Sequence, residues 1–290
     1  MILAAIDIGS NAVRLQINRP ITYDGVTNFK KLQYIRFPLR LGSDVFENNE
    51  IGDEKFREFV KLMIAFKNMI DLYRVDEYYA CATSAMREAE NGNALVQAVK
   101  AACDLDIDII SGDLEAELIN RVIAFNLQPN EHYLHIDVGG GSTELTIYHG
   151  EEKVVSRSFP LGTVRMLKHS ERMETWDEML QWILDHKGKV AHLVAIGTGG
   201  NIRKLFELTN REKGKYIGIL KLEEELKILK EMPYEDRVIK LQLNEDRADV
   251  IIPACEIYIT LMKKAGAKKI LVPDVGLKDG IISYLYDKNT

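Results

Sequence analysis

Three consecutive glycines near the middle of the chain, in the segment IDVGGGSTEL (residues 136–145), follow one apolar run and precede an alternating one. This pattern predicts a strand, a turn and a second strand. Three glycines let the backbone approach an anion and direct several amides at it, because no Cβ intervenes. Ser142 and Thr143 add hydroxyl donors, and Asp137 stands where a carboxylate beside phosphate would hold a divalent cation or a water. Taken alone, the segment is equally compatible with an ordinary glycine-rich hairpin.

A second copy of this device at the amino terminus favours the phosphate-binding interpretation. Residues 2–8 form an apolar run that leads into Asp7-Ile8-Gly9-Ser10-Asn11, and residues 12–17 alternate as a returning strand. Asp7 and Asp137 therefore occupy the same place in I-D-[IV]-G-[SG]. We interpret Ser10 and Asn11 as further phosphate contacts.

A second kind of turn is also present in both halves. A predicted strand at residues 77–82 leads into TSAMREAENG (83–92), and another at residues 193–196 leads into GTGGNIR (197–203). Each turn opens a predicted helix, and helix amino termini bind phosphate through unpaired amides and the helix dipole. Thr83, Ser84, Gly199 and Gly200 are therefore candidate phosphate contacts.

The remaining pattern predicts an α/β chain with strands and helices in both halves. Predicted strands cover residues 29–41, 107–111, 144–149, 152–158, 190–196 and 269–272, and predicted helices cover residues 53–73, 113–127, 175–186, much of 222–262 and the carboxyl end to about 287. The strands at residues 2–8, 12–17 and 29–41 should form an antiparallel meander. At 290 residues and 46% hydrophobic composition, the chain is more compatible with two lobes around an intervening cleft than with one.

Composition narrows the function. A net charge of −6 argues against a surface that coats nucleic acid, so we expect a narrow phosphate site and no nucleic-acid partner. No apolar run reaches the ~20 residues that cross a bilayer, and the amino terminus lacks a basic signal region, which predicts a cytoplasmic protein without a membrane partner. The three scattered cysteines have no metal-ligand spacing and are best interpreted as buried apolar residues.

Two charged residues have both a structural and a functional interpretation. As an acid in the first turn of a helix, Glu115 stabilises that helix by ~0.5 kcal/mol; alternatively, it orients a water that attacks phosphorus. Arg87 is either a surface arginine at a helix start or, after the Thr83-Ser84 turn, a bidentate phosphate clamp.

Seven segments together resemble the exopolyphosphatase/guanosine pentaphosphate phosphohydrolase (Ppx/GppA) family. They are AAIDIGSNAVRL (4–15), ATSAMREAENG (82–92), ISGDLEAELI (110–119), IDVGGGSTEL (136–145), IGTGGNIRKL (196–205), DRADVIIPA (246–254) and DVGLKDGI (274–281). The segments extend from end to end of the chain in the family order, which makes the combination specific.

The resemblance implies two ribonuclease-H-like lobes of the actin-like ATPase superfamily, each with a mixed five-stranded sheet, and an active site in the interlobe cleft. The lobes would cover residues 1–124 and 125–275, with the last helix, 276–290, packing back on the first lobe. A homodimer is also a family expectation.

The resemblance further implies hydrolysis of a terminal phosphate, from polyphosphate or from the 5′ γ position of guanosine pentaphosphate, with Mg²⁺ or another divalent cation. It places the catalytic glutamate at Glu115 and the aspartate that holds metal and water at Asp137, with Asp7 as a second metal ligand and Arg87 as a catalytic clamp. The implied phosphate contacts are Ser10, Asn11, Thr83, Ser84, Gly139, Gly140, Gly141, Ser142, Gly199 and Gly200.

Two departures from the family pattern leave alternatives open. Leu114 stands where many relatives have the first of two glutamates, and the chain lacks the carboxy-terminal helical domain of long relatives, which favours short polyphosphate or a nucleotide. A non-catalytic regulator that binds guanosine penta- or tetraphosphate is one alternative. A kinase of the same superfamily, using the Gly197–Asn201 turn, is another, although the Thr83–Gly92 motif argues against it.

Overall fold

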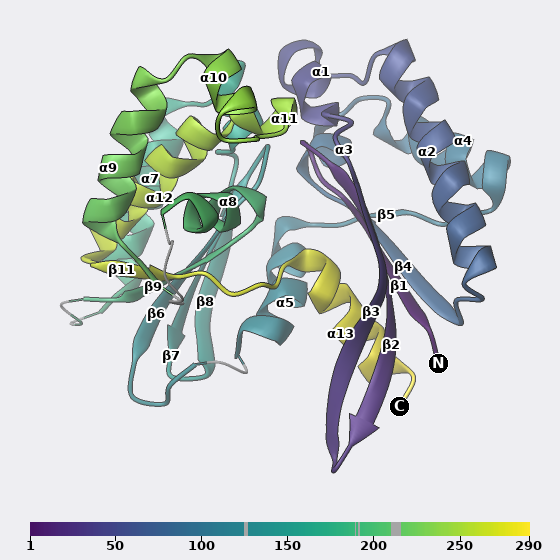
Figure 1. The fold of residues 1–290 in the computed structure, drawn as a ribbon, viewed down its shortest axis with the longest axis horizontal. Helices are drawn as coiled ribbons and strands as arrows, with labels where there is room; N and C mark the ends of the chain where they lie inside the picture. The colour runs from purple at the N-terminus through teal and green to yellow at the C-terminus, as the bar shows by residue number, and fades with distance from the viewer. Residues whose placement is uncertain (125–126, 189, 191, 210–215) are drawn as a thin grey trace. The chain divides into compact units, whose positions relative to one another are not determined.

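The computed structural model describes residues 1–290 except 125–126, 189, 191 and 210–215 (Figure 1). The chain divides into two compact units, Met1–Val122 with Gly276–Thr290, and Ile123–Val275. Each unit contains an open mixed sheet with helices, so the predicted α/β class is confirmed. Across the described residues, every helix is too short or too polar to cross a bilayer.

The sheet of the first unit has the strand order β3-β2-β1-β4-β5. Its strands are β1 (Leu3–Ile8), β2 (Val13–Tyr23), β3 (Val26–Phe37), β4 (Glu77–Ala82) and β5 (Asp108–Ile109). The first three are antiparallel, which confirms the predicted meander, whereas β4 runs parallel to both β1 and β5.

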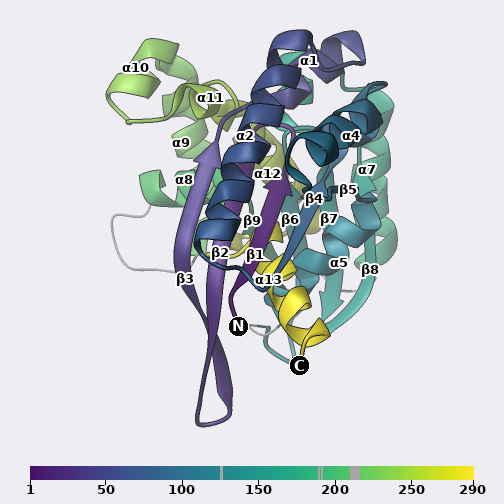
Figure 2. The same ribbon diagram turned by 90° about the vertical axis from the view of Figure 1, so that its right-hand side faces the viewer.

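The β2–β3 ribbon is longer than the sequence pattern predicted and extends beyond the rest of its sheet (Figure 2). We expected the second strand to end at residue 17, because apolar alternation stops there, but it continues to Tyr23. Asp24 and Gly25 close the ribbon with φ values of 49° and 76°. Two successive positive φ values are typical of the hairpin turn that matches the twist of the strands.

The helices of the first unit are α1 (Leu41–Asn48), α2 (Asp53–Leu72), α3 (Ser84–Glu88), α4 (Gly92–Cys103), α5 (Gly112–Ile123) and α13 (Leu277–Lys288). Helix α2 buries Phe59, Met63, Phe66 and Ile70, which lie on its predicted apolar face, and packs beside α4 (Figure 1). Helix α1 was not predicted, and where one short helix was expected with the turn at residues 83–92 the structure has two, α3 and α4. Helix α4 begins at a glycine for a reason that only the fold reveals: a Cβ on Gly92 would stand 2.3 Å from the Met86 carbonyl oxygen.

The last helix lies against the sheet of the first unit. Helix α13 contacts β1, β2 and β4, and Gln16 donates a 2.8 Å hydrogen bond to Asp279. Gly280 is the point of closest approach to α5, since a Cβ there would stand 1.9 Å from the Leu118 carbonyl oxygen. Glycine therefore lets two helices distant in sequence approach each other in this unit.

The sheet of the second unit has the order β10-β11-β9-β6-β7-β8. Its strands are β6 (His132–Val138), β7 (Thr143–His149), β8 (Glu152–Phe159), β9 (Val194–Thr198), β10 (Tyr216–Gly218) and β11 (Lys269–Leu271). The expectation of five strands is wrong for this unit, because β10 adds a sixth. Only Ile217 of that strand is buried, so it has no alternating pattern to detect.

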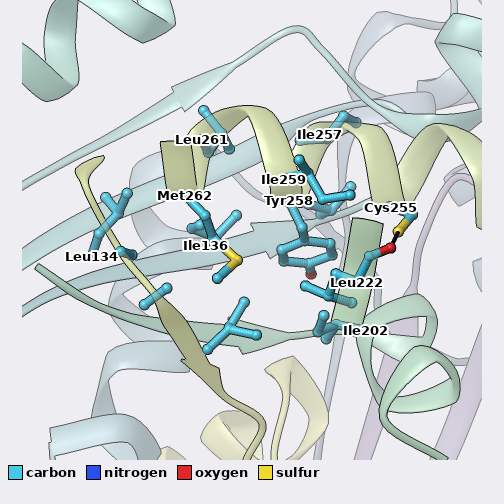
Figure 3. Packing of buried hydrophobic residues seen from close by; sticks show 14 of the residues in the cluster. Leu134, Ile136, Ile202, Leu222, Cys255, Ile257, Tyr258, Ile259, Leu261 and Met262 are labelled. Carbon is cyan, nitrogen blue, oxygen red and sulfur yellow. Dashed lines mark hydrogen bonds between the residues drawn. The ribbon is translucent and has the colours of Figure 1, made fainter. Parts of the chain in front are cut away.

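The helices of the second unit are α6 (Thr163–Leu167), α7 (Met173–His186), α8 (Gly200–Thr209), α9 (Ile219–Glu231), α10 (Tyr234–Ile239), α11 (Glu245–Ala248) and α12 (Ile251–Ala265). Helix α12 contacts α6, α7, α8, α9 and β6, and its side chains form much of the core cluster in Figure 3. Pro253 lies in its first turn, where a missing amide costs no helical hydrogen bond.

Candidate functional site

The first unit brings two of the predicted phosphate turns together. Strands β1 and β4 are parallel neighbours, and Ile8 pairs with Ala82 at their carboxyl ends. The Thr83 amide donates to the Ile8 carbonyl at 3.1 Å, and the Ser10 hydroxyl accepts from the Ala85 amide at 3.2 Å. The Ser10, Thr83 and Ser84 side chains are buried. The adjacent strand ends thus bring together hydroxyl side chains from residues far apart in the chain.

The backbone carbonyls of the Ser10–Asn11 turn also accept hydrogen bonds from the start of α1, a helix that the sequence pattern did not predict. The Gly42 amide donates to the Ser10 carbonyl at 2.8 Å, and the Arg40 amide donates to the Asn11 carbonyl at 3.0 Å. These bonds restrict the backbone that carries the Ser10 hydroxyl.

Asp7, expected to be a second metal ligand, is buried and ion-paired. Its register partner across the β1–β2 ladder is Arg14, and the two side chains are 2.6 Å apart. Arg87, expected to be a phosphate clamp, is exposed and donates to the Ile110 carbonyl at 2.6 Å. In this structure Arg87 therefore ties α3 to the residues that precede α5.

Glu115 lies in the first turn of α5 and is 9% exposed. Ser111 caps this helix: its hydroxyl accepts from the Leu114 amide at 3.2 Å, and its carbonyl accepts from the Glu115 amide at 3.0 Å. Burial is the main cause that raises the pKa of the Cys81 thiol, and the negative charges of Asp7, Asp108 and Glu115 raise it further. The Asp7 and Glu115 carboxylates therefore both raise the pKa of Cys81, which lies near the end of β4.

In the second unit, Asp137 lies against the Gly199 turn. Strands β6 and β9 are parallel neighbours, and Asp137 pairs with Thr198 at their ends. A Cβ on Gly199 would stand 3.0 Å from Asp137 Oδ1, and Gly199 has a φ of 99°, a region that L side chains rarely adopt. Glycine is thus required here for both conformation and space, and it leaves room for the Asp137 carboxylate beside this turn.

The carbonyls of the Gly139–Gly141 turn accept hydrogen bonds from the start of α6. The Gly139 carbonyl accepts from the Thr163 amide at 3.0 Å, and the Gly140 carbonyl accepts from the Val164 and Arg165 amides at 2.8 and 3.1 Å. In the described part of the chain, the Gly140 and Gly141 amides donate to no backbone carbonyl. The carbonyls of the turn are therefore bound by the protein, as they are in an anion-binding nest, where the amides face the ligand.

Two arginine side chains donate hydrogen bonds to the carbonyls of these turns. Sequence analysis gave neither arginine a role. Buried Arg165 donates from Nε to the Gly141 carbonyl at 2.9 Å, and Arg247 donates from Nη1 to the Gly200 carbonyl at 2.5 Å. The segment that contains Arg247 was noted only as part of the family resemblance, and Arg165 was not singled out. No local pattern indicates that a guanidinium will reach a carbonyl 24 or 47 residues away.

Among the described residues, no group of three or more histidine, cysteine, aspartate or glutamate side chains is arranged to hold a metal ion. Mg²⁺ often takes one or two protein carboxylates and completes its shell with phosphate oxygens and water. Asp137, next to the Gly199 turn, provides a carboxylate suited to that kind of site.

Known proteins resemble this chain along its length. A curated relative, the bifunctional 3-dehydroquinate synthase/phosphatase of Fusobacterium nucleatum, is 32% identical over 170 residues, which cover 56% of this chain and about a quarter (25%) of that protein. The crystal structure of the Aquifex aeolicus Ppx/GppA family member is 25% identical, with a TM-score of 0.77, and covers 100% of this chain and 99% of that one.

A third protein confirms the fold. An exopolyphosphatase from Cytophaga hutchinsonii has a TM-score of 0.85 at 22% identity, over 99% of this chain and 98% of its own. The sequence profile of the Ppx/GppA phosphatase family matches residues 22–289, nearly the whole chain. The chain belongs to the Ppx/GppA phosphatase family.

Proposed function

We propose that this protein is a phosphohydrolase that removes the terminal phosphate from inorganic polyphosphate, preferentially short chains, or the 5′ γ-phosphate from guanosine pentaphosphate. The observation that carries the proposal is the Gly139–Gly141 turn, with its carbonyls bound to α6 and Asp137 against the neighbouring Gly199 turn. Amides that converge near a carboxylate suit the terminal phosphate of a polyanion, which needs both hydrogen-bond donors and a group that holds metal or water.

The residue roles in this proposal are those that the family resemblance implies. Glu115 and Asp137 orient the water that attacks the terminal phosphorus in line with the departing phosphate oxygen. The Gly139–Gly141 amides and the Ser10 hydroxyl stabilise charge on the equatorial oxygens. Mg²⁺, when bound at Asp137, would neutralise further charge on the phosphate chain.

Arg87 and Asp7 have more limited support. Each already has a protein partner, Ile110 and Arg14 respectively. We propose that Arg87 exchanges its bond to the Ile110 carbonyl for a bidentate contact when substrate binds. Asp7 remains a proposed second metal ligand that would compete with its ion pair.

The test is phosphate release by the purified protein with Mg²⁺ from four compounds: short polyphosphate, long polyphosphate, guanosine pentaphosphate and ATP. We expect release from one of the first three and a loss of about 10²-fold or more in the Glu115→Gln variant. Glu117→Gln is the matched control, because Glu117 is an exposed acid on the same helix. Equal turnover in both variants would refute the assignment of Glu115.

The same experiment distinguishes the proposed enzyme from a non-catalytic regulator. Tight binding of guanosine penta- or tetraphosphate by calorimetry, without phosphate release from any compound, would overturn the enzyme proposal and support the regulator. We also propose that the protein is a cytoplasmic homodimer. Light scattering of the purified protein tests the dimer, and a monomer mass at working concentration would contradict it.

A further inference from the structure

Thr198, the last residue of β9, is held by two buried side chains. Its carbonyl accepts a 2.6 Å hydrogen bond from the Tyr258 hydroxyl, and its own hydroxyl lies 2.8 Å from His135 Nε2. Thr198, Tyr258 and His135 are each no more than 1% exposed. A hydrogen bond in such an environment is electrostatically stronger than one in water, so both contacts restrict Thr198.

The two side chains come from rigid elements. His135 is in the middle of β6, two positions before Asp137, and Tyr258 is on α12. The Tyr258 ring lies within the core cluster, close to Ile136 and Ile202 (Figure 3). Because the ring is closely packed, its hydroxyl cannot follow a displaced carbonyl without disturbing the core.

The bond from Tyr258 also sets the direction of a group in the proposed phosphate site. The Thr198 carbonyl and the Gly199 amide belong to one planar trans peptide, so they point in opposite directions. When Tyr258 binds the carbonyl, the Gly199 N–H is directed away from Tyr258. Gly199 is free to rotate about its own φ, and its φ of 99° lies where glycine is nearly unrestrained, so the preceding peptide plane needs an external restraint.

We propose that Tyr258 and His135 are positioning residues that hold the Thr198–Gly199 peptide so that the Gly199 amide and the Asp137 carboxylate serve the same bound phosphate. The proposal rests on the proposed phosphohydrolase function. Neither residue touches the substrate: His135 acts through Thr198, and Tyr258 acts through Thr198 and through the backbone of Val138, the neighbour of Asp137.

The central variant is Tyr258→Phe, which removes the hydroxyl and keeps the ring in the core. Tyr133→Phe is the matched control: Tyr133 is also buried in the second unit, and its hydroxyl accepts only a structural bond from the Gln128 amide at 3.0 Å. Both variants keep the ring and lose only hydrogen bonding to backbone, so their thermal midpoints should fall by amounts of the same order. We expect kcat/KM to fall about tenfold or more for Tyr258→Phe and less than twofold for Tyr133→Phe.

His135 is tested by a pair of variants. Glutamine can present an amide nitrogen to the Thr198 hydroxyl, whereas leucine cannot, so His135→Gln should retain more activity than His135→Leu at equal folded fraction. Equal kinetic losses in the two variants would show that His135 acts only through packing.

A second readout separates this proposal from the proposed function. With ¹⁵N-glycine labelling, the amide signals of Gly199 and Gly200 report the turn directly, without substrate. We expect Tyr258→Phe to shift these signals and Tyr133→Phe to leave them unchanged. If the wild-type protein releases no phosphate from any compound, the proposed function is wrong. The Gly199 and Gly200 amide signals still show whether Tyr258 restrains the turn. Unshifted signals in Tyr258→Phe would overturn the positioning role whether or not the protein is an enzyme.

Discussion

Gly162 lies so close to Gly140 that a Cβ added to Gly162 would stand 2.5 Å from the Gly140 carbonyl carbon. The residue after it begins α6, whose first amides bind the carbonyls of the glycine turn. The contact between these two glycines therefore sets how closely the helix approaches the turn. It explains why glycine is needed at a position outside the glycine-rich motif itself.

The Gly162→Ala variant should lose both stability and activity. The added methyl meets backbone on the turn side, so the α6 start must move away, at a cost of about 1–3 kcal/mol, and the turn loses the bonds to its carbonyls. Urea denaturation and phosphate release measure the two effects. Gly218→Ala is the control, because a Cβ there meets nothing within 4 Å. Equal stability of the two variants would contradict this account of the contact.

The Gly199→Ala variant should lose activity out of proportion to stability. Alanine at a φ of 99° is strained by ~1–3 kcal/mol, and its Cβ would stand 3.0 Å from Asp137 Oδ1. Gly25→Ala shares the backbone strain, with a φ of 76°, but its Cβ has open space around it at a hairpin tip. We therefore expect similar losses of unfolding free energy in the two variants and loss of turnover in Gly199→Ala alone. Full turnover in Gly199→Ala would show that the turn does not contact the substrate.

The Arg165→Met variant should be destabilised by roughly 1–3 kcal/mol, because the Gly141 carbonyl loses its guanidinium donor in a buried site. Arg157→Met is the control: Arg157 lies 4.7 Å from the Phe159 ring centroid and pairs with Glu178, but half of its side chain is exposed (49%). Surface ion pairs contribute ~0–1 kcal/mol, so this change should cost little. Chemical denaturation compares them, and a larger loss for Arg157→Met would reverse the expected order.

Stability should fall at alkaline pH in part because of Cys255. Burial raises its pKa to about 12 from an ordinary value of 9.0, with smaller contributions from Glu225 and Glu256. Above pH 9 the unfolded thiol loses its proton while the folded one keeps it. The stabilisation by the buried thiol is therefore complete below pH 9 and is lost as pH rises toward 12, at up to about 1.4 kcal/mol per pH unit.

The comparison of wild type with Cys255→Ala isolates this effect. The wild-type advantage in unfolding free energy, measured by urea denaturation under nitrogen, should shrink by roughly 1 kcal/mol between pH 8 and pH 10. An unchanged advantage at the two pH values would mean that the thiol titrates equally in both states.

Local sequence patterns predicted much of the first unit and the central turn. The apolar face of α2, the β1–β2–β3 meander and the strand–turn–strand around the glycines depend on periodicity and on glycine content, which are properties of neighbouring residues. The Asp24-Gly25 turn also carried a local signal, a typical hairpin dipeptide that could have extended the predicted strands.

The strand and helix that were not predicted have only weak patterns in the local sequence. Strand β10 has three residues, and the glycine that starts α4 reads as a break in the helix when the sequence is considered alone. Its reason is the approach of the Met86 carbonyl oxygen, a contact that exists only after folding.

The family, the α/β class and the two repeated aspartate–glycine turns could be predicted from short stretches of sequence, because each signal depends on residues within a few positions of each other. The groups that support those turns became known from the fold. Arg165 binds Gly141, Arg247 binds Gly200, and Tyr258 binds Thr198 across separations that no periodic pattern covers. A backbone carbonyl has no sequence signature, so the partner that satisfies it is known only when the chain has brought the two together.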